Sequence, residues 1–155
     1  MTELRIAPVL RWALLSAVLL VCFSPLVAEP VDVKLEARLI WGTNDEQSPN
    51  PKHKPVDVAL TKTLRKVFKW KNYFEENRQN MAIPLNDTRK ASMSQQCALE
   101  VKNLGNSRVE VKLFGSGKQV ARSVQMLPDG DWLTLAGADK NDTAWFVVIR
   151  KDSAK

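Results

Sequence analysis

Residues 31–41, VDVKLEARLIW, alternate apolar and polar side chains. A period of two places all the apolar side chains of an extended chain on one face. The segment therefore predicts a half-buried strand, with a core on one face and water on the other. Any fold for this chain must supply a second layer to cover that apolar face.

The chain after residue 80 consists of short apolar or alternating runs. Strings rich in turn-forming residues separate them, namely NLGNS, GSG, PDG and ADKND. Such short connections favour antiparallel neighbours. The last run, AWFVVI, is apolar in both phases, which predicts an interior strand. The predicted strands are MAIPL, SQQCALEV, RVEVKLF, KQVARSVQML, DWLTLA and TAWFVVI.

Between these regions the period changes. A polar, proline-bearing stretch, residues 42–55, predicts a long surface loop. Apolar residues then recur at helical spacing from Val56 to Phe68, which predicts one amphipathic helix. We therefore expect an α+β fold, with one amphipathic helix packed on a mostly antiparallel β-sheet or a flattened barrel.

The amino-terminal 28 residues have the order of a secretory signal peptide: a cationic start, an apolar run and a small residue, Ala28. The apolar run of residues 12–23 is shorter than the ~20 residues of a membrane-spanning helix. The pattern predicts export to the periplasm or the extracellular space, with residues 29–155 forming a single domain. Lipoprotein anchoring through Cys22 is a minor alternative, because Val21 stands where a small residue is expected.

Removal of this leader leaves Cys97 as the one cysteine, so no intrachain disulfide can form. Its place in the apolar phase of QCALEV favours a small buried hydrophobe over a reactive thiol. Asn86 and Asn141 begin sequons, which would accept glycans in a eukaryotic secretory pathway and are ordinary turn residues otherwise.

The positive charge of the chain is concentrated. Residues 52–71 hold seven Lys and Arg side chains against Asp57 alone. A basic helix face attracts anionic polymers, lipids or acidic proteins, although such a face is often merely solvated. The aromatics that follow could form a stacking platform for single-stranded nucleic acid or close the edge of a core, and no specific nucleic-acid motif is present. The candidate anion-binding residues are Lys62, Arg65, Lys66 and Lys69, and the candidate platform is Trp70 with Tyr73.

Catalytic and metal-binding patterns are weak. His53 is the only histidine, and no G-x-S-x-G sequence marks a nucleophile. Glu75 and Glu76 are adjacent, so a strand would send them to opposite faces. The ADKNDT string lacks the glycine and the final acid of a calcium loop and predicts a hairpin turn. We predict no catalytic residue, metal site or cofactor.

Several strings are similar to small exported bacterial proteins of unassigned function: LIWGTNDE, KVFKWKNYFEENRQN, CALEVKNLGNSRVEVKLFG and LTLAGADKNDTAWFVVI. The resemblance implies export and implies no activity. A shorter string, PDGDWLTLAG, resembles the glycine-punctuated hairpin of secretin-type outer-membrane proteins.

These observations predict an exported, non-enzymatic binding or assembly module of the cell envelope. Its partner, an envelope or secreted protein, would contact the 42–55 loop and the basic helix face. Two alternatives stay open: a binder of an anionic polymer or lipid through the basic face, and an enzyme of unrecognised type.

Overall fold

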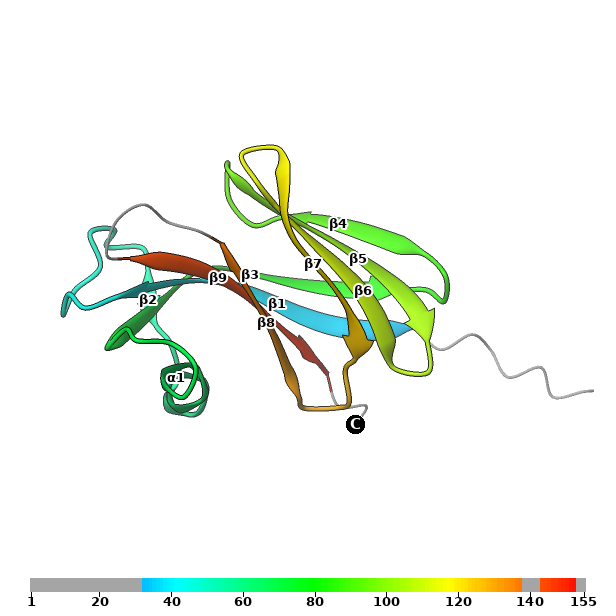
Figure 1. Cartoon of the computed structure of the whole chain (residues 1–155), viewed down its shortest axis with the longest axis horizontal. Coiled ribbons are helices and arrows are strands. Elements are labelled where there is room, and N and C mark those ends of the chain that lie inside the picture. Colours follow the sequence, from blue (N-terminus) through cyan, green and yellow to red (C-terminus); the bar gives the residue numbers. More distant parts are fainter. Residues whose placement is uncertain (1–31, 138–142, 153–155) are drawn as a thin grey trace, which may run out of the picture.

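The computed structural model describes residues 32–137 and 143–152, which form two antiparallel sheets packed face to face (Figure 1). Sheet A has the strand order β2-β3-β1-β9-β8, and sheet B has the order β4-β5-β6-β7. The elements are β1 (Val33–Thr43), β2 (Lys54–Pro55), α1 (Val58–Arg65), β3 (Asn72–Ile83), β4 (Thr88–Ser92), β5 (Cys97–Gly105), β6 (Arg108–Gly115), β7 (Lys118–Met126), β8 (Trp132–Gly137) and β9 (Ala144–Lys151).

The expected α+β class is wrong. Among the described residues the fold is mostly antiparallel β, with 60% of them in strands and 7% in one short helix, and neither sheet closes into a barrel. The helical pattern did predict a helix, but that helix covers only one end of the outer face of sheet A. The long apolar face of β1 is covered instead by sheet B, because the later strands form a layer of their own.

The strand predicted over residues 31–41 is β1, and its alternation sets the two faces. Val33, Leu35, Ala37 and Leu39 point into the core between the sheets. Ile40 follows directly and is also buried, because α1 covers the outer face at that position. Strand β9 runs between β1 and β8, which confirms the interior strand predicted from AWFVVI.

The helix packs through a second apolar cluster on the outer face of sheet A. Leu60 and Leu64 are fully buried against Phe146, and each contributes about 2 kcal/mol of apolar burial. The Phe146 ring fits because Gly42 on the neighbouring strand has no side chain; a Cβ at Gly42 would stand 2.9 Å from the ring. The predicted apolar stripe stops short, since Val67 is 73% exposed.

An ionic network ties the start of α1 to sheet A. Asp57 accepts the backbone N–H of Leu60 at 2.9 Å as the N-cap, and its other oxygen accepts Arg38 Nη1 at 2.8 Å. Arg38 is buried and also pairs with Glu36 and Glu75. The Leu60 amide first, and then the Arg38 guanidinium, hold the pKa of Asp57 below its usual value, against the opposing effect of partial burial.

The outer face of sheet B carries a cross-strand row of alternating charge. Lys90 and Lys112 both pair with Glu100, and Glu110 pairs with Arg122. These exposed pairs keep the outer face of the four-stranded sheet in water and contribute little stability individually.

Two tight turns follow the predicted strings NLGNS and GSG, whereas the predicted turn at ADKND, residues 138–142, lies outside the described residues. The two-residue hairpins at Asn106-Ser107 and Ser116-Gly117 have positive φ at both positions, which suits the twist of the flanking strands. The predicted loop 42–55 is shorter than expected, because β1 extends to Thr43 and Lys54–Pro55 pair with β3 as β2.

No helix in the described part of the chain is long and apolar enough to cross a membrane. The predicted leader 1–28, with Cys22, and the sequon at Asn141 lie outside the described residues.

Candidate functional site

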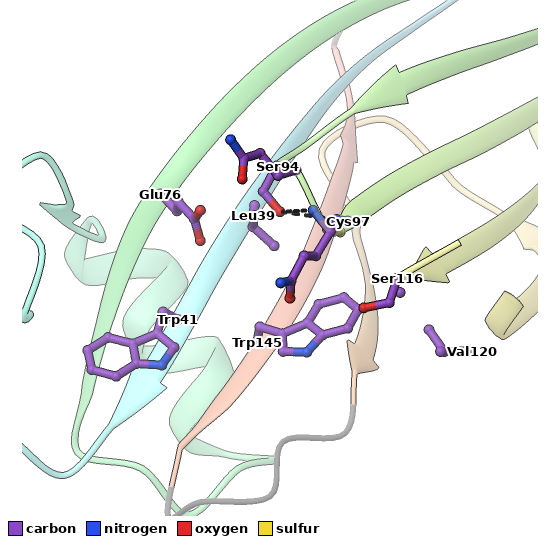
Figure 2. A pocket seen from close by; sticks show the side chains of 11 residues that line it. Leu39, Trp41, Glu76, Ser94, Cys97, Ser116, Val120 and Trp145 are labelled. Carbon is purple, nitrogen blue, oxygen red and sulfur yellow. Dashed lines mark hydrogen bonds between the residues drawn. The ribbon is translucent and has the colours of Figure 1, made fainter. Parts of the chain in front are cut away.

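A cavity of about 640 Å³ lies between the two sheets where β1 ends and β9 begins. Sheet A contributes Leu39, Trp41, Glu76 and Trp145 to its wall. The opposite wall consists of residues 94–97 with Gly115, Ser116 and Val120 from the β6–β7 hairpin. We call this space the interlayer cleft. Figure 2 shows Trp41, Glu76 and Trp145 projecting into it from neighbouring strands.

The two tryptophans are direct cross-strand partners on β1 and β9. Their rings diverge: Trp41 lies toward Phe74 and His53, each at a centroid distance of 6.3 Å. The ring of Trp145 lies over Gly137 on β8, where a Cβ would come within 2.0 Å of the indole. Because the rings turn away from each other, a space remains between them.

Trp145 also reaches the opposite sheet. A Cβ at Gly115 on β6 would lie 3.3 Å from the Trp145 ring. The indole is therefore wedged between sheet A and sheet B at the edge of the interlayer cleft. Because Gly137 and Gly115 have no side chains, the ring can occupy this position against the backbone of both strands.

Two β-bulges, one in each sheet, supply wall residues. In the β1–β3 pair, Leu39 faces Asn77 and Ile40 faces Glu75, so Glu76 is the extra residue. In the β6–β7 pair the register skips Val120 in the same way. A bulge re-aims the side chain it carries and is enriched next to functional sites. Here both bulges direct a side chain into the same cavity.

The polar part of the wall is a tight turn before β5. The Ser94 hydroxyl accepts the backbone N–H groups of Gln96 and Cys97, and the Ser116 N–H donates to the Gln96 carbonyl at 2.7 Å. These bonds hold the turn against the β6–β7 hairpin. The side chains of Gln95 and Gln96 stay exposed as hydrogen-bonding groups at the mouth of the cleft.

Glu76 is exposed and is the one charged side chain among the described residues that line the cleft. Burial, reinforced by the nearby Glu76 carboxylate, raises the pKa of Cys97 to about 11. The thiol is therefore protonated at neutral pH and is a poor nucleophile. This burial confirms the prediction that Cys97 is a small hydrophobe.

The other residues considered for catalysis lie elsewhere. His53 Nδ1 bonds to Ser48 Oγ at 2.7 Å, but that hydroxyl also accepts the Asn50 N–H, so the contacts fix the turn of the loop. Glu75 points away from the cleft and pairs with Arg78. Within the described residues, no group of three or more His, Cys, Asp or Glu side chains is arranged to hold a metal ion.

The predicted basic residues are all exposed on or just after α1: Lys62, Arg65, Lys66 and Lys69. Arg65 donates to the Lys71 carbonyl, which closes the turn after the helix. The Lys69 ammonium lies 5.4 Å from the Trp70 ring centre. Lys62, Arg65 and Lys66 border a shallow groove beside Val58.

The predicted aromatic platform does not form. Tyr73 is 3% exposed and belongs to the cluster beneath α1, so it cannot stack on a ligand. Trp70 is half-buried and packs edge-on against Phe146. These two residues close a core because the chain leaves α1 directly over the outer face of sheet A.

The sequence reasoning missed the cleft. Trp41 was assigned to the buried face of the first strand, and Trp145 to an interior strand. Both tryptophans do lie between the sheets, but each side chain is only partly buried and lines the cleft. The available signal was the placement of a tryptophan at the end of one predicted strand and at the start of another.

No protein-family model, curated protein or solved structure matches this chain.

Proposed function

We propose that this protein is an exported, non-enzymatic binding module that holds its ligand in the interlayer cleft. One observation carries the proposal. The bulges at Glu76 and Val120 arise in different sheets and turn their side chains into one cavity beside two accessible tryptophans. Binding sites commonly combine apolar and aromatic walls with a few polar groups, in cavities of about 300–1,000 Å³.

The chemistry of the wall favours binding over turnover. Acid–base catalysis on a glycoside requires a second carboxyl group within about 10 Å, and the nearest sequence neighbour, Glu75, is occupied on the opposite face. The Cys97 thiol is protonated. What the described lining residues offer is ring surface, amide and hydroxyl groups and one carboxylate, which are groups that orient a ligand.

The proposal is tested by nuclear magnetic resonance on the indole N–H signals. A panel of small cationic, anionic, neutral and sugar-like compounds is added to the purified protein. A ligand of the cleft should shift the Trp41 and Trp145 signals and leave those of Trp70 and Trp132 in place, because the latter two lie on the outer face of sheet A. The internal comparison separates cleft binding from a general solvent effect.

Two outcomes contradict the proposal. One is a panel in which no compound shifts the two cleft signals. The other is turnover of a compound by the purified protein that is abolished by Glu76→Gln, since that would make the cleft a catalytic centre.

The basic face of α1 supports a second candidate, contact with an anionic polymer or lipid. The specific support is that exposed apolar side chains lie beside these cations. Val58 is 85% exposed and Val67 is 73% exposed, next to Lys62 and Lys66. Apolar tips flanked by cations suit the interface of an anionic membrane.

Vesicles containing anionic lipid test this candidate. Binding should weaken as salt is raised and should be lost in a Lys62→Gln, Lys66→Gln variant. A Lys34→Gln, Lys118→Gln variant carries the same charge change on exposed positions away from α1 and should bind normally. Equal loss in both variants would assign the effect to net charge.

A further inference from the structure

We infer that the interlayer cleft selects a ligand with a positively charged organic group, such as an ammonium group. This inference rests on the proposed function, because it names the ligand class of the same site. It is carried by the charge of the wall, by two tryptophan rings over which no described cation lies, and by the neutral hydrogen-bonding groups beside them.

The charge of the wall excludes anions and favours cations. The chain has a formal net charge of +6, yet Glu76 is the one charged side chain among the described residues of the cleft. The bulge in β3 places this carboxylate beside the space between Trp41 and Trp145. It forms no ion pair with a described residue. An incoming cation would therefore meet a carboxylate that is not already neutralised.

The tryptophans outside the cleft show how this protein uses indole faces. Arg38 and Arg150 each lie 5.2 Å from the Trp132 ring centre, and Lys69 lies 5.4 Å from that of Trp70. Among the described residues, no protein cation lies over Trp41 or Trp145. Cations within about 6 Å of an indole face are attracted by its quadrupole. The two cleft rings therefore have no cation from the described residues over their faces.

The remaining wall adds neutral groups that suit an ammonium. The side-chain amide oxygens of Gln95 and Gln96 and the hydroxyl of Ser116 are hydrogen-bond acceptors, while Leu39 and Val120 provide apolar surface. An ammonium with or without N–H donors therefore finds partners in the cleft, and its positive charge is the property that the wall selects.

Choline and its carbon isostere, in which a tert-butyl group replaces the trimethylammonium, provide the test. The two molecules have the same shape and differ in charge. Affinity is measured from the shifts of the Trp41 and Trp145 indole signals. We expect choline to bind the wild-type protein about tenfold more tightly than the isostere, from the combined attraction of the rings and the carboxylate.

Glu76→Gln should weaken choline binding about tenfold, since it removes the carboxylate's attraction, and should leave isostere binding unchanged. Glu46→Gln is the matched control, because Glu46 is exposed outside the cleft wall and the charge change is the same. Circular dichroism confirms that both variants fold. Vesicles of phosphatidylcholine, compared with free choline, distinguish a lipid headgroup from a soluble ligand.

The outcomes are separable. Equal affinity for choline and its isostere, or an unchanged choline affinity in Glu76→Gln, overturns the ammonium inference and leaves the cleft a binding site. Failure of every compound in the panel to shift the cleft signals overturns both the inference and the proposed function.

Discussion

Replacing Gly137 with alanine tests whether the Trp145 ring packs directly against the backbone of β8. The added Cβ would lie 2.0 Å from two atoms of the Trp145 indole, well inside van der Waals contact. The backbone is not the obstacle, since Gly137 has ordinary extended geometry on β8. The ring must therefore move away from β8, and the added methyl group acts as overpacking. We expect the free energy of unfolding to fall by about 1–3 kcal/mol.

The assay is urea denaturation of four proteins: wild type, Gly137→Ala, Trp145→Ala and the double variant. In the Trp145→Ala background the steric conflict is absent, so Gly137→Ala should change the free energy of unfolding by less than about 0.5 kcal/mol. Double-mutant coupling of this size is measurable between contacting residues. If the alanine is equally costly with and without the indole, the steric argument is refuted.

Three substitutions probe the ionic network, and one labelling experiment probes the thiol. Asp57→Ala should lower the free energy of unfolding by about 1 kcal/mol, because it removes the N-cap of α1. Since folding lowers the Asp57 pKa, this stabilisation is complete above the usual pKa of 3.8 and is lost as pH falls through the folded value, so urea titrations of variant and wild type should converge in acid. Arg38→Met should cost about 1.5–3 kcal/mol, because it removes the hydrogen bonds of a buried guanidinium and leaves half-buried Glu36 and Glu75 with Arg78 alone. Arg78 is more exposed, so Arg78→Met should cost less than about 1 kcal/mol. Similar urea midpoints for the two variants would contradict this account. Cys97 should react slowly with a disulfide reagent at pH 8 and rapidly in denaturant, because its native pKa is about 11; rapid native labelling would show that the thiol is accessible.

The sequence by itself determined the strands, their faces and several turns. These features depend on local periods: alternation along β1 selects the inward side chains, and the apolar run of β9 requires cover on both faces. The turn at Ser116-Gly117 likewise follows from residues that tolerate positive φ. Leu60 and Leu64 belong to the apolar residues that recur at helical spacing from Val56 to Phe68, and both are buried beneath α1.

Only the tertiary structure decided what covers each face and where a cavity remains. A period shows that a face is buried but does not name its partner, so the helix was expected to cover a sheet that another sheet in fact covers. Tyr73 became core for the same reason. Glu76 entered the cleft through a bulge, which is defined by register with β1, more than 30 residues earlier in the chain. Such placements arise from pairing between segments that are distant in the sequence, so a local sequence pattern does not predict them.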